Sequence, residues 1–170
     1  MPFHYRLYSG NTFSIKQLCY ALEFLVTKHL SLRTAFSFDT EKNHFTQQIL
    51  DFNDDGEQLF TFIESTFEND QQLNEIIVNE KCNSQLFNLM KGLVFRCHIV
   101  HHKRNSFYDV LCDKDAIIFN FYQTSFDFAS MNVFLRDLQQ AYGISQLFTS
   151  ETNIVQYYDC EYEYYILNLA

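Results

Sequence analysis

Residues 116–122 constrain the fold most strongly, because this short segment is apolar on both of its alternating faces. Successive side chains of a strand point to opposite faces of a sheet, so a strand with one face in water alternates hydrophobic and polar residues. Here large apolar side chains occupy both faces: Ile117, Ile118, Phe119 and Phe121. This pattern is typical of the middle of a covered sheet. The sequence therefore predicts a sheet with helices packed against it.

Around this strand, the hydrophobic period switches between that of a helix and that of a strand. Ser14–His29 is the clearest amphipathic helix, and Ser14 with Gln17 forms a capping box at its start. The expected order is a helix at 14–29, strands at 32–38 and 44–50, helical segments at 59–67 and 73–77, strands at 93–100, 107–112 and 116–122, and helices at 131–142 and 155–169. A turn at 53–56 follows the second strand, and Gly143 ends the helix before it. This order predicts one domain, residues 1–170, with an α/β (α+β) two-layer sandwich fold.

Composition and charge exclude several classes of protein. Hydrophobic residues make up 47% of the chain and charged residues 19%, as in a globular domain. The net charge is −9 and the 12 Lys and Arg are scattered, so no nucleic-acid partner is expected. No segment approaches the roughly 18 to 20 consecutive apolar residues that span a bilayer, and the start lacks a signal-peptide pattern. We therefore expect a cytoplasmic protein that does not bind membranes.

Cysteine and histidine spacing gives no metal site. The five cysteines contain no C-x-x-C pair, which favours reduced thiols. His98 and His102 fall on one face of a predicted strand, but no third ligand follows at a recognisable spacing. His101 and His102 precede a polar stretch, so they are expected at the exposed end of a strand.

Four short sequence motifs follow one another along the chain. Residues 28–36 read K-H-L-S-L-R-T-A-F and resemble R-H-E-x-L-R-T-x-F. Residues 87–96 resemble an F-D-L-x-x-G-P-L-x-R stretch, and residues 117–142 have the layout of a strand, an H-H-x-x-x-D-G-x-S loop and a helix. Residues 157–160 are similar to a Y-x-D-Y segment. In this order and at similar spacings, the four motifs resemble those of the condensation domains of nonribosomal peptide synthetases, and together they span nearly the whole chain.

This resemblance implies the N-terminal lobe of a two-lobed, chloramphenicol-acetyltransferase-like fold, with a mixed β-sheet covered by helices. Nothing in the sequence corresponds to the C-terminal lobe, so the chain is expected to be a fragment of a condensation domain or a free-standing half. The implied activity is amide-bond formation between carrier-bound acyl or aminoacyl groups in nonribosomal peptide synthesis. The implied partners are carrier-protein domains, which bring phosphopantetheine arms, and the C-terminal lobe. No directly bound cofactor is implied.

The active-site loop departs from the family pattern at the residues that carry the chemistry. Aligning Asp127 and Ser130 with the motif places Tyr122 and Gln123 at the two His positions. The resemblance implies that the second His positions or deprotonates the attacking amine, in a tunnel between the lobes. Gln123 can form hydrogen bonds but takes up no proton at ordinary pH. Loss of a general base costs about 10² to 10⁴ in rate, so the site is expected to be catalytically impaired.

Three further residues of the loop have expected roles. Phe128 stands at the motif's Gly, where it either narrows the tunnel or packs as a core aromatic. Ser130 is a second candidate for lining the tunnel, and an expected N-cap of the following helix, with Asp127 close to the same role. The resemblance also implies a structural ion pair between Asp127 and Arg33.

Two functions remain open from the sequence. The first is an impaired condensation-type acyltransferase lobe, and the alternative is a degenerate, non-catalytic remnant that binds a protein or simply persists as a folded module. A lone lobe exposes the surface that normally faces its partner lobe, so self-association is expected. In the predicted last helix, Tyr157 and Tyr164 are left for solvent or a partner.

Overall fold

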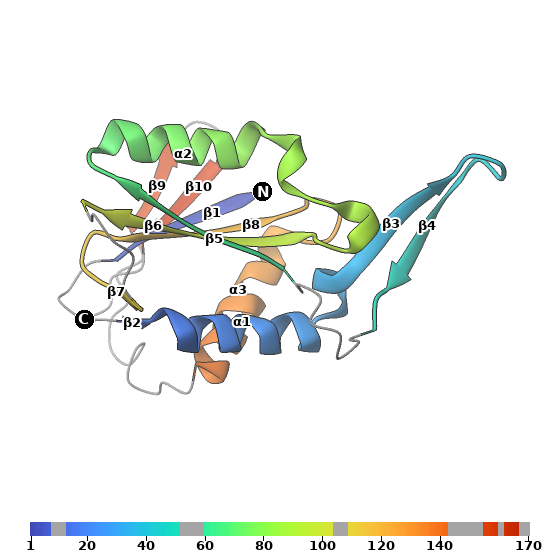
Figure 1. Ribbon diagram of the computed structural model, residues 1–170, viewed down its shortest axis with the longest axis horizontal. Helices are drawn as coiled ribbons and strands as arrows, with labels where there is room; N and C mark the ends of the chain where they lie inside the picture. Colours follow the sequence, from blue (N-terminus) through green and yellow to red (C-terminus); the bar gives the residue numbers. More distant parts are fainter. Residues whose placement is uncertain (8–12, 52–59, 104–108, 143–154, 160–161, 167–170) are drawn as a thin grey trace.

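A four-stranded mixed sheet forms the centre of the molecule (Figure 1). The computed structural model describes residues 1–7, 13–51, 60–103, 109–142, 155–159 and 162–166. The strand order is β1–β8–β6–β5, with β1 at Pro2–Arg6, β8 at Ala116–Phe121, β6 at Phe95–His102 and β5 at Thr61–Phe67. The β1–β8 and β8–β6 pairs are antiparallel, and the β6–β5 pair is parallel.

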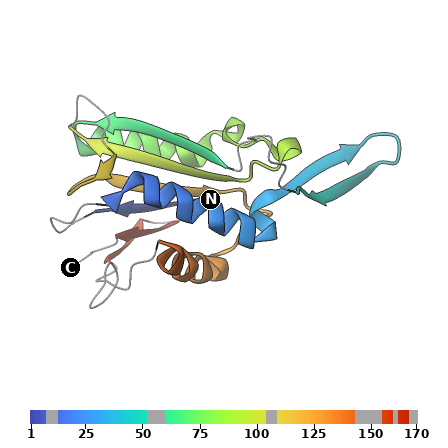
Figure 2. The same cartoon turned by 60° about the horizontal axis from the view of Figure 1, so that its bottom comes forward.

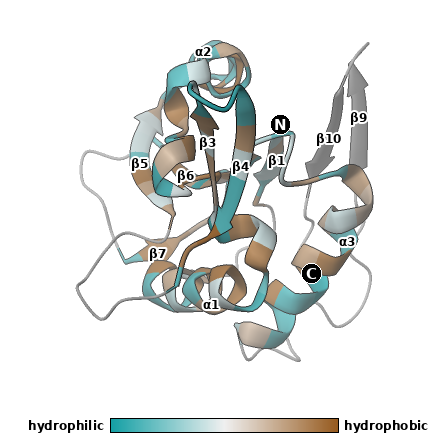
Figure 3. Cartoon of the chain, turned by 90° about the vertical axis from the view of Figure 1, so that its right-hand side faces the viewer, coloured by the Kyte–Doolittle hydropathy of each residue, from teal (hydrophilic) through white to brown (hydrophobic). Residues whose placement is uncertain are grey.

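Helices cover both faces of this sheet. Helix α2 (Asp70–Cys82) lies on one face, and α1 (Ile15–Lys28) and α3 (Phe128–Ala141) lie on the other (Figures 1 and 3). All six residues of β8 are buried, which confirms the prediction of a covered central strand. The α/β class and the mixed sheet are confirmed, and helices on both faces give the lobe three layers where two were expected. None of the described helices is long and apolar enough to cross a membrane.

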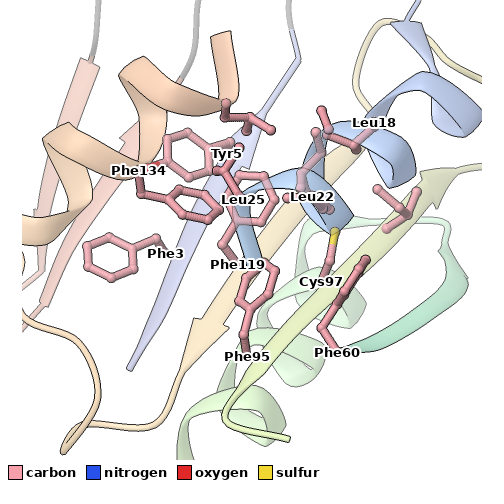
Figure 4. Close-up of a cluster of buried hydrophobic side chains, with 14 of the residues drawn as sticks. Phe3, Tyr5, Leu18, Leu22, Leu25, Phe60, Phe95, Cys97, Phe119 and Phe134 are labelled. Carbon is pink, nitrogen blue, oxygen red and sulfur yellow. The ribbon is translucent and has the colours of Figure 1, made fainter. Parts of the chain in front are cut away.

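The larger core lies between the sheet and the pair α1 and α3 (Figure 4). The ring of Phe134, on α3, lies edge-to-face on Phe95 of β6 and Phe119 of β8, with centroids 5.5 and 5.3 Å apart. Leu22 and Leu25 of α1 are fully buried in the same cluster. Burial of each such side chain stabilises the fold by about 1.5 to 3 kcal/mol, so this cluster fixes α3 against β8. A smaller core under α2 contains Leu73 and Ile77.

A two-stranded hairpin projects from the body of the molecule (Figure 2). It consists of β3 (Thr34–Asp39) and β4 (His44–Ile49), paired antiparallel. All six residues of β4 are exposed, and the rings of Phe38 and Phe45 face each other across the strands at 4.8 Å.

Short elements complete the fold. They are β2 (Phe13–Ser14), which pairs with β7 (Val110–Leu111), the 3₁₀ turns η1 (Leu30–Arg33), η2 (Ser84–Leu86) and η3 (Leu89–Lys91), and the hairpin β9 (Val155–Asp159) with β10 (Tyr162–Ile166).

Two helices predicted from the sequence are strands in the structure. Residues 61–67 form β5, because the β-branched and aromatic residues of T-F-I-E-S-T-F pair in parallel with β6. Residues 155–159 and 162–166 form the antiparallel pair β9 and β10, and the alternation of Tyr and Glu at 162–164 has the period of a strand, which the sequence analysis missed in favour of a helical spacing. The predicted outward placement of Tyr157 and Tyr164 rested on that helix, and their side chains lie outside the described part of the structure.

Other boundaries also differ from the prediction. The predicted strand at 107–112 reduces to Val110–Leu111 in the described part, and β1 was not predicted at all. The helix at 14–29 is confirmed, with the Ser14 hydroxyl accepting from the Gln17 N–H at 3.3 Å. The turn at 53–56, Gly143 and Cys160 lie outside the described residues.

Candidate functional site

The loop from Tyr122 to Asp127 joins β8 to α3 and opens onto a cavity of about 270 Å³. The loop contributes Tyr122, Gln123 and Thr124 to the cavity wall, and the end of α2 with the segment after it contributes the opposite side, residues 80–84. Phe87 and Phe121 provide apolar surface between them. The cavity thus combines amide, hydroxyl and charged groups with three aromatic rings, those of Phe87, Phe121 and Tyr122.

Tyr122 joins three of the sequence motifs. Its ring lies 5.8 Å from that of Phe87, in the second motif, and 6.3 Å from that of Phe36, in the first. Its backbone N–H donates to the Val94 carbonyl at 2.8 Å. The residue aligned with the motif's first His therefore packs the other motif segments against the loop.

The second motif folds as a capped turn. The Asn88 side chain accepts from the Lys91 N–H at 3.2 Å, and Gly92 ends the turn in the left-handed conformation with φ +65°. A Cβ at Gly92 would lie only 2.7 Å from Leu50 Cδ1. Both the backbone angle and this close approach favour glycine, which explains the motif's Gly physically.

A buried carboxylate ties the first motif to the helix that follows the loop. Asp137, on α3, accepts from Lys28 Nζ at 2.6 Å and from His29 Nε2 at 2.9 Å. The hydrogen bond from Lys28 lowers the pKa of Asp137 despite its burial, with further help from His29. No local pattern in the sequence predicts this link, because His29 and Asp137 are 108 residues apart.

Gln123 is exposed on the cavity wall. Its amide can donate and accept hydrogen bonds, and the described residues that line the cavity include no histidine. The titratable side chains among them include Glu80, Lys81 and Cys82. The geometry offers positioning by hydrogen bonds at Gln123, with no imidazole to take a proton.

Asp127 and Arg33 are not brought together in this structure. Asp127 is exposed and caps α3, where it accepts from the Ser130 N–H at 2.8 Å and from the Ser130 hydroxyl at 2.5 Å. These hydrogen bonds lower the pKa of Asp127. Arg33 instead donates to the Leu50 carbonyl and holds the end of β4. The expected ion pair is not formed, because each side chain satisfies a local backbone group.

Phe128 and Ser130 lie at the start of α3 and are not among the described residues that line the cavity. Phe128 is 46% exposed, with its ring 5.5 Å from Phe3 in an edge-to-face contact. It has no left-handed backbone angle, so glycine is not required there for conformational reasons. The N-cap itself is Asp127, one turn before Ser130.

Behind the cavity lies a buried polar network that sequence reasoning missed. Glu80 accepts from Arg96 Nε at 3.0 Å, from His98 Nδ1 at 2.8 Å and from Asn120 Nδ2 at 3.0 Å. Burial alone would raise the pKa of Glu80, but these hydrogen bonds and the Arg96 charge lower it. The sequence alone does not indicate the roles of Arg96, His98 and Asn120, because their common partner, Glu80, lies on α2.

The prediction for His101 was wrong. Its side chain is fully buried, with Nε2 2.7 Å from Glu64 Oε2 and Nδ1 3.5 Å from Asp115 Oδ2. Burial alone would lower the pKa of His101, but the hydrogen bonds to Asp115 and Glu64 outweigh it and raise the pKa. Across the described residues there is no group of three His, Cys, Asp or Glu side chains that could hold a metal ion.

Of the comparisons with known proteins, only the one with solved structures finds similar proteins. No protein-family model matches the sequence, and no curated protein matches it. Among solved structures, the epimerization domain from the third module of tyrocidine synthetase B aligns with 14% identity and a TM-score of 0.64, over 84% of this chain and 29% of that one. The condensation domain of the monacolin K polyketide synthase MokA aligns with 13% identity and a TM-score of 0.61, over 89% and 30%.

The chain has the fold of one condensation-domain lobe. A third match, the X-domain in its complex with OxyB from teicoplanin biosynthesis, has 23% identity and a TM-score of 0.58, over 84% of this chain and 27% of that one. The expected chloramphenicol-acetyltransferase-like lobe is confirmed. The chain spans about 30% of the length of these solved chains, which is the extent of one lobe.

Proposed function

We propose that this condensation-type lobe keeps the scaffold of the active-site loop without its general base, and that it binds a carrier-linked acyl group without condensing it. The observation that carries the proposal is Gln123, which aligns with the motif's second His and lines the cavity. An amide there positions a carbonyl or an amine by hydrogen bonds. It does not supply the proton transfer that contributes about 10² to 10⁴ in rate.

The cavity supports a narrow, polar ligand such as the end of a phosphopantetheine arm. Its volume of about 270 Å³ is slightly below the roughly 300 to 1,000 Å³ of drug-sized ligand pockets. Gln123, Thr124 and Asn83 offer donors and acceptors for the amides of such an arm, and Phe87 and Phe121 offer apolar contact for its methylene groups.

Calorimetric titration with free pantetheine tests the binding. We expect Gln123→Ala to weaken binding by about 2- to 10-fold, since one neutral hydrogen bond contributes about 0.5 to 1.5 kcal/mol. Gln47→Ala is the matched control, because Gln47 lies on the exposed strand β4, outside the cavity. Absence of pantetheine binding, or equal weakening by both variants, contradicts the proposal.

A carrier assay tests the absence of catalysis. The wild-type chain is mixed with an acyl-loaded and an aminoacyl-loaded carrier protein, and amide product is measured by mass spectrometry. We expect no product above background, and a gain with Gln123→His only when a C-terminal condensation lobe is added. Product formed by the wild-type chain alone refutes the non-catalytic assignment.

Binding of a whole protein partner is the second candidate function. It is favoured by the likeness to the X-domain, which was solved in a complex with the protein OxyB. In this alternative the fold presents a docking surface, and the Gln123 cavity has no ligand. The Gln123→Ala titration separates the two, because only the first candidate requires the amide of Gln123.

A further inference from the structure

A serine, a histidine and a glutamate form a continuous hydrogen-bonded chain outside the loop described above. Ser65 Oγ lies 2.7 Å from His98 Nε2, and His98 Nδ1 lies 2.8 Å from Glu80 Oε1. The three residues come from β5, β6 and α2. Parallel pairing of β5 with β6 brings Ser65 and His98 to the same face of the sheet, which α2 covers.

The chemistry of Glu80 sets the proton positions in this chain. Hydrogen bonds from His98 and Asn120 and the Arg96 charge keep the pKa of Glu80 low, so its carboxylate only accepts. His98 Nδ1 must then carry the hydrogen that Glu80 accepts. In the neutral imidazole the other nitrogen, Nε2, is left as an acceptor, and it faces the Ser65 hydroxyl. The ring is thus held in the tautomer in which it can take the serine proton.

The three hydrogen-bonded side chains differ in exposure to solvent, as a nucleophile with a buried general base requires. The side chains of His98 and Glu80 are 7% and 0% exposed, whereas Ser65 is partly exposed. Ser65 lies on β5, which is an outer strand of the four-stranded sheet. In the part of the chain that the structure describes, no strand pairs with the outer side of β5, so a reactant can approach Ser65 from that edge, where alternate backbone N–H groups of an edge strand point outward and can donate to a developing oxyanion.

We propose that Ser65 is a nucleophile that accepts an acyl group from an activated ester or thioester, with His98 as its general base and Glu80 as the residue that positions His98. The Ser65 oxygen bonds to the acyl carbonyl carbon, and the carbonyl electron pair moves to its oxygen. His98 Nε2 takes the hydroxyl proton. As the carbonyl re-forms, the bond to the leaving alcohol or thiol breaks, and His98 returns the proton to that group. The product is an ester on Ser65.

This site is separate from the proposed binding role of Gln123, which neither supports nor requires it. Glu80 is shared, since it also lines the Gln123 cavity, but the reacting oxygen lies on β5. Failure of pantetheine binding therefore leaves the Ser65 proposal standing, and failure of acylation leaves the pantetheine proposal standing.

The test uses p-nitrophenyl acetate as the acyl donor and peptide mapping by mass spectrometry as the readout. We expect acetylation of Ser65 at least tenfold faster than of Ser37, the internal reference, which is exposed on β3 outside both proposed sites and whose hydroxyl lies 2.5 Å from that of Thr46. Ser65→Ala removes the fast acetylation and Ser37→Ala does not change it. Because removal of a general base costs about 10² to 10⁴, a folded His98→Gln protein slows Ser65 acetylation by tenfold or more.

Two results overturn the proposal. One is acetylation of Ser65 in the wild-type chain no faster than that of Ser37. The other is a folded His98→Gln protein, verified by circular dichroism, that acetylates at the wild-type rate. If His98→Gln does not fold, the ratio of Ser65 to Ser37 acetylation in the wild-type chain decides alone.

Discussion

Substitution of Gly92 by alanine tests whether the second motif is a structural device. Gly92 has φ +65°, a conformation that costs an L-residue about 1 to 2 kcal/mol. The new Cβ would also lie 2.7 Å from Leu50 Cδ1, so the Leu50 side chain must rotate away. An off-rotamer side chain costs about 0.5 to 1.5 kcal/mol. We expect Gly92→Ala to lower the free energy of unfolding by about 2 to 3 kcal/mol, measured by urea denaturation.

A second measurement separates the backbone cost from the steric cost. In a Leu50→Ala background the clashing methyl group is absent, so Gly92→Ala should cost only the backbone part, about 1 to 2 kcal/mol. In thermal denaturation the single variant should melt about 4 to 12 °C below the wild-type chain, at about 2 to 4 °C per kcal/mol. A loss below about 0.5 kcal/mol in the single variant refutes the structural reasoning, since surface substitutions away from special features fall in that range. Equal costs in the two backgrounds refute the steric part only.

Three further predictions concern the buried ion pairs and the exposed hairpin. The pKa of His101 is raised in the folded state, so folding favours its protonated form. The stability that this contributes is full below about pH 6.5 and is lost as the pH rises through the folded-state pKa. The difference in urea midpoint between the wild-type chain and His101→Gln should therefore be larger at about pH 5.5 than at about pH 8.5, and equal differences would contradict this. Asp137→Asn should lower the free energy of unfolding by about 1 to 3 kcal/mol, less than for a fully buried pair because Lys28 and His29 are partly exposed, whereas Arg136→Ala at the exposed neighbour should change it little. Phe45→Lys should reduce self-association, measured by sedimentation velocity. The reason is that Phe45 is 79% exposed on an edge strand whose residues 45–49 include no charged side chain. A wild-type chain that stays monomeric at every concentration would show that the hairpin does not mediate association.

The central strand and the main helices could be predicted because their signals are local. Residues 116–121 are apolar on both faces, and 15–28 keep one apolar stripe, so no distant partner is needed to assign them. Strand β5 could not be assigned in this way, since 61–67 also fits a helical spacing and becomes a strand by pairing with β6, more than 30 residues away. The loop position of Gln123 could be predicted from the motif alignment, because it follows directly from β8.

The polar contacts around the site could not be predicted either, because they too join residues that are far apart in the sequence. Nothing in the local sequence shows that His101 lies between Glu64 and Asp115, because Glu64 is 37 residues away and arrives through the parallel pairing of β5. The polar residues that follow His102 favoured an exposed turn instead. The missing ion pair of Asp127 and Arg33 has a related cause: a motif gives residue types in order, while local caps decide which group each side chain meets.

Most of the motif residues in this chain have structural roles that need no catalysis. Tyr122 packs against Phe36 and Phe87, Gly92 provides a left-handed turn, and Asp127 caps α3. Each of these roles would persist in a lobe without activity, so the presence of the motifs supports the fold and does not by itself support an enzyme. Gln123 is different, because it lies exposed on the cavity wall and the structure gives it no packing role. Substitution of Gln123 is therefore expected to leave the scaffold intact, as the proposed binding role without condensation chemistry requires.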